Sequence, residues 1–510
     1  MSVNAGLTVD LSASPATIAT GSSTTLSWHS DSATSVTISG VTGTFAGSGS
    51  VTVSPASTTN YTATATDSGG NTANSTITVT VVTPVGSLAG IKHIIFFVQE
   101  NRSFDSYFGK LGTYRASRVS GASPRDVNDL DSLPAGFALY TPATGVQDPS
   151  SPIPPFHQRT LRTEDLAPNW SASHADADIA NKDYLDITGQ TFKMDEFLKT
   201  VVPDSWDPDG TRAMGYYDQT DFPYYYELAT QFATSDAYHS SLLSSTVTNR
   251  MYLFAATSAG LCNTATTGHA PWPVKTIFES LQNNGVSWRY YYQDGVFLAQ
   301  FAAWSDPVIQ SHVWKISNLF TLLADPEADS KLPQVVFIEH GLSTDEHPTD
   351  DVQTGAVYVK SVIDALLASS AWKDSIFILT YDEGGGLYDH VPPFPVVEPD
   401  NIPPDGCNYP KGNFDLSGFR VPLVVLSPYA KAHYVSHTNM EHTSILKLIE
   451  TRFNLPPLTA RDAAAPDMTE FFDFNNPAWL TPPVLPDQKD ECVTDATRCK
   501  QSLEAYPGAP

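Results

Sequence analysis

Four continuous apolar runs restrict the possible folds of this chain more than any other feature of its sequence. They read HIIFFV, QVVFIE, SIFILTYD and VPLVVLSP, and they occupy residues 93–98, 334–339, 375–382 and 421–428. Runs without polar alternation are typical of strands that are buried on both faces of a parallel sheet. Because helices must cover both faces of such a sheet, the runs predict an α/β fold in which a layered sheet is flanked by helices.

Apolar residues at helical spacing predict the helices that would cover this sheet. The candidate segments lie at residues 224–238, 276–285, 357–369 and 443–453. Two further segments, at about 111–170 and 385–420, are rich in Pro, Gly and Asp and are too long for simple connections. Loops of this length commonly form a site or its lid, so we expect them to contribute to function.

Residues 1–84 differ in composition from the rest of the chain. They contain no Lys or Arg and are dominated by Thr, Ser, Val, Ala and Gly. Short alternating runs such as TTLSWHS and NYTATATD recur at intervals of roughly 8–12 residues, which is the pattern of an antiparallel β-sandwich. The segment TPVGSLAG (83–90) predicts a linker from its Pro and Gly content. We therefore expect two domains, at residues 1–84 and 85–510.

The net charge of −27 argues against nucleic acid as a partner, because phosphate backbones bind to basic surfaces. A small phosphate ester is still compatible with this charge, since a bound metal cation inverts the local field. No stretch approaches the ~20 apolar residues of a transmembrane helix. The N-terminus lacks the basic and apolar regions of a signal peptide, and we expect a secreted or periplasmic protein from which that peptide is absent.

The cysteines at positions 262, 407, 492 and 499 form no C-x-x-C pair, which argues against a zinc ribbon or a thioredoxin motif. Cys492 and Cys499 stand in a polar tail, where a disulfide between them would close a small loop. Such a disulfide would fit an oxidising compartment. A reduced pair is the alternative, and the pairing of Cys262 and Cys407 stays open.

Oxygen-rich side chains follow three of the apolar runs at the points where the strands are expected to end. These residues are Glu100 and Asn101, Asp382 and Glu383, and Asp345, Glu346 and His347. Ligands of open α/β sheets bind beyond the carboxyl ends of the strands. Hard oxygen ligands from separate strand ends suit a divalent cation. A polar loop that caps the strand is the alternative for any one pair, but the three together predict a metal site at this edge of the sheet.

Five blocks of the sequence resemble a known family in their residues and in their order. They are QENRSFDSYFG (99–109), MGYYDQTDFPYYYELATQFATSDAYHSSLLSSTVTNRMYL (214–253), TYDEGGGLYDHVPP (380–393), GFRVPLVVLSPYAK (418–431) and EHTSILKLIETRF (441–453). They resemble the bacterial phosphoesterase family that holds non-haemolytic phospholipases C and acid phosphatases, and they cover most of residues 91–455. The resemblance implies an alkaline-phosphatase-like fold, in agreement with the α/β sheet predicted above. Residues 1–84 resemble instead the small bacterial immunoglobulin-like modules of secreted enzymes. We thus expect a phosphoesterase catalytic domain with a C-terminal tail at residues 85–510.

The resemblance also implies a divalent metal cation, whose identity stays open, and a nucleophile bound to it. The implied metal ligands are Glu100, Asn101, Asp382, Glu383 and Thr246. The family's nucleophile stands in a Gly-Pro-Thr-x-Pro-Asn-Arg block, and residues 244–250 place Thr246 at its position. The glycine and both prolines are replaced in this chain, so Ser244 and Ser245 stay open as alternatives.

A threonine hydroxyl needs activation before it can attack phosphorus. Its pKa is too high for nucleophilic attack at neutral pH unless a base or a metal lowers it. Coordination to a cation supplies that activation. In-line attack would then give a phosphothreonine intermediate, which water hydrolyses.

Proton transfer and phosphate binding need further side chains. Three histidines resemble active-site histidines of the family: His174, His347 and His442. The candidates for contacts with phosphate oxygens are Arg102, Arg250 and Asn249. Salt bridges that organise the loops are the alternative for the two arginines. His239 and His340 receive no assigned role.

These features predict a secreted, metal-dependent phosphoric-ester hydrolase of phospholipase C type. Its expected substrate is a phosphate ester, including a phospholipid at a membrane surface. A broad-specificity acid phosphatase is the alternative, because the two activities share every catalytic residue named above. A non-catalytic surface binding protein fits less well, since the predicted ligands and the hydroxyl at Thr246 are all present.

Overall fold

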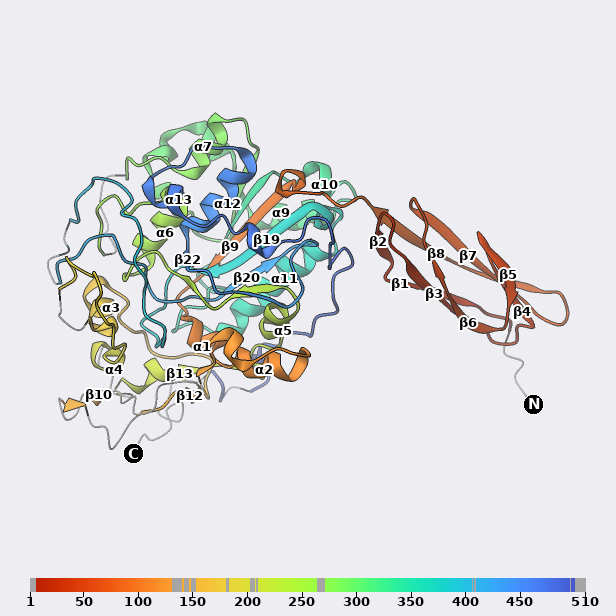
Figure 1. The fold of residues 1–510 in the computed structure, drawn as a ribbon, viewed down its shortest axis with the longest axis horizontal. Helices are drawn as coiled ribbons and strands as arrows, with labels where there is room; N and C mark the ends of the chain where they lie inside the picture. Colours follow the sequence, from red (N-terminus) through yellow and green to blue (C-terminus); the bar gives the residue numbers. More distant parts are fainter. Residues whose placement is uncertain are drawn as a thin grey trace. The chain divides into compact units, whose positions relative to one another are not determined.

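The computed structural model describes residues 6–130, 140–141, 146–147, 153–179, 183–201, 207, 210–263, 271–405, 407, 410–495 and 497–499. These residues form two compact units (Figure 1). One unit contains the described residues up to Gly90 together with Asp473–Pro483, and the other contains Ile91–Phe472 and the described residues from Val484 onward. The division along the chain follows the end of the segment that the sequence predicts as a linker. The end of the predicted C-terminal tail, residues 500–510, lies outside the described residues.

The N-terminal unit is all-β, as the alternating runs predict. Its strands are β1 (Asp10–Ser14), β2 (Thr17–Ala19), β3 (Thr24–His29), β4 (Ser35–Ile38), β5 (Val41–Phe45), β6 (Ser48–Val53), β7 (Thr59–Thr66) and β8 (Thr72–Val82). They form one sheet of order β1-β3-β6 and a second of order β2-β8-β7-β4-β5. Inward-facing side chains of both sheets, among them Leu26, Trp28 and Tyr61, share one hydrophobic core. Each sheet alone would expose that apolar face to water, so the two stabilise each other.

The second unit is built around an eight-stranded sheet of order β17-β16-β18-β9-β19-β20-β14-β21. Its strands are β9 (His93–Gln99), β14 (Ala233–Ser235), β16 (Trp288–Tyr292), β17 (Val313–Lys315), β18 (Val335–Glu339), β19 (Ser375–Tyr381), β20 (Leu423–Leu426) and β21 (Tyr434–Ser436). Every residue of β9, β18, β19 and β20 is buried. Burial on both faces explains why these four strands appear in the sequence as continuous apolar runs.

One strand departs from the predicted parallel arrangement. β9, β16, β17, β18 and β19 pair in parallel, but β20 runs antiparallel to β19 and to β14. The described residues between β19 and β20 contain no helix that would return the chain to the opposite edge. The chain therefore re-enters the sheet from the edge at which β19 ends, and this requires an antiparallel pair.

Helices cover both faces of the sheet. Figure 1 shows α6 (Thr246–Ala255), α7 (Ile277–Asn283) and α12 (Thr443–Phe453) on one side and α1 (Phe104–Phe108), α2 (Leu111–Arg118) and α5 (Pro223–Gln231) on the other. The remaining helices are α3 (Trp170–Ala177), α4 (Phe197–Thr200), α8 (Pro307–Ser311), α9 (Ile316–Leu323), α10 (Ala328–Lys331), α11 (Val352–Leu367) and α13 (Ala460–Ala464). Short strands outside the main sheet are β10 (Tyr140–Thr141), β11 (Val146–Gln147), β12 (Phe156–His157), β13 (Gly215–Tyr216), β15 (Tyr238–His239) and β22 (Met440–Glu441). Among the described residues, no helix combines the length and the apolar character needed to cross a bilayer.

The helices predicted at 276–285, 357–369 and 443–453 are confirmed, although α11 begins five residues earlier than predicted. The helix predicted at 224–238 is wrong in its second half, because α5 ends at Gln231 and β14 and β15 follow. Backbone pairing with β20 and β21 draws residues 233–235 into the sheet. This tertiary pairing outweighs the local helical pattern.

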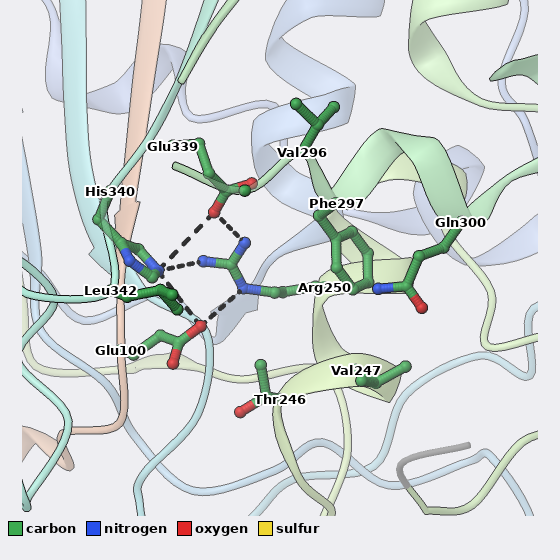
Figure 2. A pocket seen from close by; sticks show the side chains of 11 residues that line it. Glu100, Thr246, Val247, Arg250, Val296, Phe297, Gln300, Glu339, His340 and Leu342 are labelled. Carbon is green, nitrogen blue, oxygen red and sulfur yellow. Dashed lines mark hydrogen bonds and ion pairs between the residues drawn. The ribbon is translucent and has the colours of Figure 1, made fainter. Parts of the chain in front are cut away.

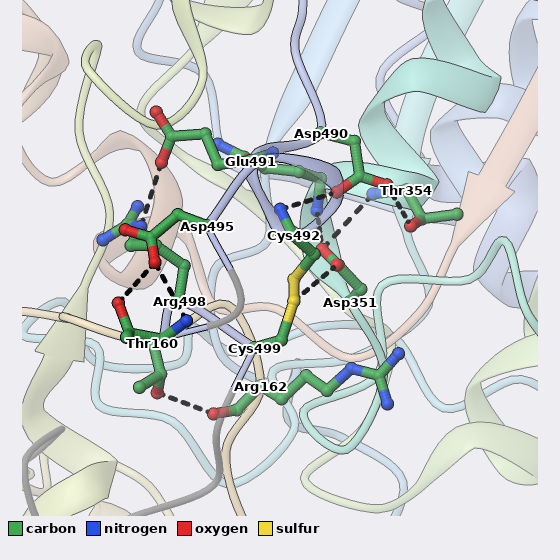
Figure 3. Close-up of a disulfide and its surroundings, with 12 residues drawn as sticks. Thr160, Arg162, Asp351, Thr354, Asp490, Glu491, Cys492, Asp495, Arg498 and Cys499 are labelled. Carbon is green, nitrogen blue, oxygen red and sulfur yellow. Dashed lines mark hydrogen bonds and ion pairs between the residues drawn. A yellow bond between two sulfur atoms is a disulfide. The ribbon is translucent and has the colours of Figure 1, made fainter.

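Both cysteine pairs form disulfides: Cys492–Cys499, for which a reduced pair was the alternative, and Cys262–Cys407, whose pairing the sequence left open. Figure 3 shows the short loop that the first of these closes. The loop is attached to the helix α11, where the Thr354 hydroxyl donates to Asp490 Oδ2 at 2.9 Å. The disulfide lies within the C-terminal segment itself, and the hydrogen bond from Thr354 ties that segment to α11.

The buried strand β9 should carry much of the stability of the second unit. Phe96 is fully buried, and its ring centroid lies 4.9 Å from that of Phe337 on β18. We expect Phe96→Ala to lower the free energy of unfolding by about 3–5 kcal/mol, since it removes apolar contacts and leaves a cavity. Urea denaturation would measure this loss. The control Val484→Ala, at a side chain that is 97% exposed, should change it by less than about 0.5 kcal/mol; equal losses in both variants would contradict the assignment of the core.

Candidate active site

A pocket of about 300 Å³ lies where β9 and β18 end and α6 begins (Figure 2). Its charged and hydroxyl-bearing lining residues are Glu100, Thr246, Arg250, Glu339 and His340, and its apolar ones are Val247, Val296, Phe297 and Leu342. Figure 2 shows Phe297 and His340 on opposite sides of the Arg250 guanidinium. The pocket therefore stands at the strand edge where the sequence predicts a metal site, and it contains the predicted nucleophile.

Thr246 is the first residue of α6 and contacts a predicted metal ligand. Its hydroxyl donates to Asn101 Oδ1 at 3.3 Å. Asn101 follows β9 with a φ of 66°, a conformation that asparagine adopts more readily than most residues. Ser245 precedes the helix without a side-chain hydrogen bond to the first turn. The amide groups of that turn thus keep their capacity to bind an anion.

Ser244, one of the two alternative nucleophiles, is turned away from the pocket. Ser244 is buried, and its hydroxyl donates to the carbonyl of Cys262. Asn249, predicted to bind substrate, is also fully buried and orders the same loop. Its Oδ1 accepts from the Leu242 amide at 2.9 Å, and its Nδ2 donates to the Ser244 carbonyl at 2.7 Å. This corrects the prediction for Asn249, whose side chain holds the loop that presents Thr246.

Arg250 draws together carboxylates from three strand ends. Its Nε lies 3.5 Å from Glu100 Oε1 and 3.4 Å from Asp382 Oδ2. Its Nη1 forms an ion pair with Glu339, and its Nη2 lies 2.8 Å from His340 Nε2. The predicted ligands Glu100 and Asp382 therefore do converge in space. Arg250 participates in an ion-pair network, which was the alternative considered for it, and it also lines the pocket.

The charges of this cluster shift its titration strongly. Burial opposes ionisation of Glu100, but the charges of His340 and Arg250 and a hydrogen bond from His340 lower its pKa to about 2. Burial likewise disfavours the charged form of His340, yet the neighbouring Glu100 raises its pKa to about 9. Burial and the charge of Glu100 raise the pKa of Asp382 to about 7. For Asp382 burial is the larger of the two causes, and the charges of Arg250 and His340 offset only part of the rise.

Glu383 completes the set of oxygen donors. It is buried, its Oε2 accepts from the Gly385 amide at 2.5 Å, and its Oε1 has no hydrogen-bond partner among the described residues. Burial and then the charge of Asp382 raise its pKa well above the usual range. Gly385 has a φ of 68°, and a Cβ there would lie 2.4 Å from the carbonyl oxygen of Asn101. Only glycine lets this loop pack directly on the segment that carries the other ligands.

The donors fit a divalent cation. Carboxylate and amide oxygens are hard ligands, the Glu383 Oε1 is buried and unpartnered, and crowded negative charge is what a cation would relieve. The predicted ligands are not among the groups of three or more metal-binding side chains whose donor atoms lie within 4.8 Å of one another in the described residues. Arg250 accounts for the wider spacing, because it bridges Glu100 and Asp382.

Two of the three predicted catalytic histidines are buried away from the pocket. His442 Nε2 hydrogen-bonds the carbonyl oxygen of Asp382 at 2.7 Å, and burial lowers its pKa to about 4. His174 lies 4.0 Å from the Trp170 ring, hydrogen-bonds the Trp170 carbonyl at 2.7 Å and has a pKa lowered by burial to about 3. It lines a different cavity, together with Tyr184. The structure thus brings neither imidazole into the pocket that contains Thr246, and His442 supports the backbone at Asp382.

His347 is placed differently from these two histidines. Its side chain is 24% exposed, and its Nε2 lies 3.7 Å from Asp165 Oδ1. Its charge is also among those that lower the pKa of Glu100, although His347 does not line the pocket itself. Of the three histidines, His174 and His442 are buried and His347 is partly exposed.

Arg102 is not among the residues that line the pocket, and its side chain is used within the surrounding structure. Its side chain is 2% exposed, its Nε donates to the Glu346 carbonyl at 2.6 Å, and its guanidinium lies 5.5 Å from the centre of the Tyr107 ring. Glu339 and His340, by contrast, line the pocket without having been assigned a role. Glu339 is the last residue of the apolar run 334–339, and His340 is the next residue. The expectation that ligands lie at the carboxyl ends of strands, applied above to Glu100, would therefore have identified both.

Comparison with known proteins places this site in a family. A sequence model of the Phosphoesterase family matches residues 91–456. Phospholipase C A of Mycobacterium tuberculosis (strain ATCC 25618 / H37Rv) is 31% identical over 451 residues, which cover 78% of this chain and 80% of that protein. Non-specific phospholipase C3 of Arabidopsis thaliana is 30% identical and covers 80% of this chain and 81% of its own length. A solved structure of an alkaline phosphatase superfamily protein from Vibrio parahaemolyticus aligns with a TM-score of 0.31 and 11% identity over 48% of this chain and 64% of that one. By its match to the family model and to these relatives, the chain belongs to the Phosphoesterase family and is a hydrolase that acts on phosphoric ester bonds.

Proposed function

We propose that this hydrolase is a metal-dependent phosphodiesterase of phospholipase C type that acts through a phosphothreonine. The observation that carries the proposal is the contact between the Thr246 hydroxyl and Asn101 Oδ1, at 3.3 Å, in a pocket that also contains Glu100. A hydroxyl at a helix N-terminus beside convergent carboxylates suits attack on phosphorus. Relatives that are named phospholipases C support the substrate class.

The chain's own residues divide the reaction between them. Thr246 Oγ1 attacks phosphorus as the bond from phosphorus to the leaving alcohol breaks, and the first-turn amides of α6 bind the phosphate oxygens. The proton of the Thr246 hydroxyl passes to solvent, and His347 donates a proton to the departing alkoxide. Water then cleaves the phosphothreonine: its oxygen goes to phosphorus, one of its protons goes to Thr246 Oγ1, and His347 regains a proton from solvent. A divalent cation held by Glu100, Asn101, Asp382 and Glu383 would supply the Lewis acid that lowers the pKa of the hydroxyl.

Three further assignments belong to this proposal. The central sheet is assigned an alkaline-phosphatase-like fold, in keeping with its parallel strands and the ligands at their carboxyl ends. The N-terminal unit is assigned to the bacterial immunoglobulin-like modules, in keeping with its two sheets and disulfide-free core. Secretion or a periplasmic location is supported by the two disulfides, which form and persist in oxidising compartments.

The apolar lining of the pocket favours a lipid diester over the alternative of an acid phosphatase. Val247, Val296, Phe297 and Leu342 border the same cavity as Thr246. Leu342 is 77% exposed, which is unusual for a large apolar side chain beside charged residues. A small polar monoester gains little from such a lining, whereas the glycerol and acyl portion of a phospholipid would bury it.

Loss of the nucleophile should abolish turnover. We expect Thr246→Ala to lower kcat for a chromogenic phosphorylcholine diester on the order of 10³-fold or more, since no other positioned hydroxyl replaces it. The phosphopeptide that contains Thr246, trapped by acid quenching and found by mass spectrometry, should disappear with it. Ser244→Ala and Ser245→Ala serve as matched controls and should retain most activity. Full activity in Thr246→Ala would show that a group other than Thr246 is the nucleophile.

Loss of one oxygen ligand should weaken cation binding. We expect Glu383→Gln to bind the activating cation on the order of 10–100-fold more weakly, measured by calorimetric titration of chelator-treated protein. Glu450→Gln, at a buried carboxylate on α12 outside the pocket, is the control and should bind normally. A wild type that stays fully active after exhaustive chelation would contradict the metal dependence.

The apolar lining should separate lipid from small substrates. Leu342→Ser is expected to lower kcat/KM for vesicles of phosphatidylcholine by roughly 5–30-fold, because a buried leucine contributes about 1–2 kcal/mol. Activity on a chromogenic phosphate monoester should change less than twofold. Val484→Ser, at another exposed apolar side chain, controls for general effects. Equal losses on both substrates would favour the acid phosphatase.

A further inference from the structure

A buried carboxylate lies beside the ligand-bearing strand ends without lining the pocket. Glu346 belongs to the polar segment after β18 and has no exposed surface. Its Oε1 accepts from the Tyr225 hydroxyl at 2.5 Å and lies 3.3 Å from Gln99 Nε2, and its Oε2 accepts from the Tyr381 hydroxyl at 2.7 Å. Both carboxylate oxygens are therefore engaged by neutral donors.

Two of these donors are the last residues of the strands that carry the metal ligands. Gln99 ends β9 and directly precedes Glu100, and Tyr381 ends β19 and directly precedes Asp382. The two strands pair in parallel with Tyr381 opposite Gln99. Glu346 thus spans the final pair of the ladder, immediately before the chain leaves the sheet on both strands.

The backbone of Glu346 is attached to the same region. Its carbonyl accepts from Arg102 Nε at 2.6 Å. Arg102 follows Asn101, so Glu346 contacts residues on both sides of the Glu100–Asn101 pair. The next residue in the chain is His347, the proposed proton donor. One residue therefore connects the two ligand segments with the segment of the acid.

Burial of the Glu346 carboxylate in this space costs free energy. The charge of Arg102 acts on this carboxylate and favours its ionised form, but among the described residues no ion pair within 4.0 Å involves Glu346. A buried carboxylate held only by neutral donors is costly, and an apolar residue of similar volume would often be more stable. The hydrogen bonds of Glu346 therefore fix the positions of the neighbouring residues and add little to the free energy of unfolding.

We propose that Glu346 is a positioning residue that fixes the ends of β9 and β19 relative to each other and thereby sets the spacing of the metal ligands that follow them. This inference rests on the proposed function, since it concerns the same metal site. A displacement of about 1 Å at such a site is enough to weaken binding and catalysis substantially.

Two adjacent tyrosines of α5 offer a matched test. Tyr225 donates to Glu346, whereas Tyr224 donates to Asp364 Oδ1 at 2.8 Å on α11. Tyr225→Phe and Tyr224→Phe each remove one hydroxyl and one hydrogen bond to a carboxylate from the same helix. Only the first change affects the positioning residue. We expect Tyr225→Phe to weaken cation binding on the order of 10-fold or more and Tyr224→Phe to change it less than twofold.

Binding is measured on chelator-treated protein by calorimetric titration with Mg²⁺, Ca²⁺, Mn²⁺ and Zn²⁺, each alone, so the readout does not depend on activity. Glu346→Gln and Tyr381→Phe are titrated in parallel and should show the same loss, which covers the case in which one variant fails to fold. Thermal unfolding of the metal-free proteins reports stability separately.

The possible outcomes separate a failure of the proposed function from a failure of the positioning role alone. Wild-type protein that binds none of the four cations contradicts the proposed function itself. Wild-type binding that is unchanged in Tyr225→Phe, Tyr381→Phe and Glu346→Gln, with loss of thermal stability only, overturns the positioning role and leaves the proposed function intact. A loss of affinity of the same size in Tyr224→Phe also overturns it.

Discussion

The parallel pairing of β9 with β19 is the constraint on which the rest of the site depends. It aligns Gln99 with Tyr381 and so brings the next residues of both strands, Glu100 and Asp382, to one edge of the sheet. Continuous apolar residues bury both strands and hold this register. The strands themselves are buried, so the polar residues that follow them lie at the edge of the sheet. Oxygen-bearing side chains from distant parts of the sequence therefore meet there.

Several buried carboxylates lie close together at this edge of the sheet, and neighbouring positive charges offset their mutual repulsion only in part. Arg250 and His340 neutralise Glu100 and Glu339 through direct ion pairs. Asp382 and Glu383 keep raised pKa values because burial and neighbouring negative charge disfavour their ionised forms. Asp382 shares Arg250 with Glu100, and Glu383 forms no ion pair within the described residues, so the cluster holds more carboxylates than cationic partners. This excess of carboxylates is the physical reason for associating a cation with the end of β19 in particular.

Sequence reasoning succeeded where a pattern is local and failed where a side chain's direction matters. The four buried strands, three helices and the Cys492–Cys499 bond follow from apolar runs, helical spacing and proximity along the chain. The positions of Asn249, Arg102, His174 and His442 outside the pocket did not follow, because each side chain points into a loop or core that only the folded chain creates. The same applies to β20, whose direction depends on the absence of a crossover helix in the preceding described segment.

The sequence by itself determined that a buried α/β sheet ends in oxygen-bearing side chains and that a small all-β segment without Lys or Arg precedes it. It also contained the order of blocks that marks the family. Only the tertiary structure decided which polar residues share the pocket with Thr246, which ones support it from behind, and that Glu346 lies between the two ligand-bearing strands. The reason is physical: periodicity along a chain reports which face a residue occupies, whereas hydrogen bonds and ion pairs depend on contacts between segments that the sequence separates by hundreds of residues.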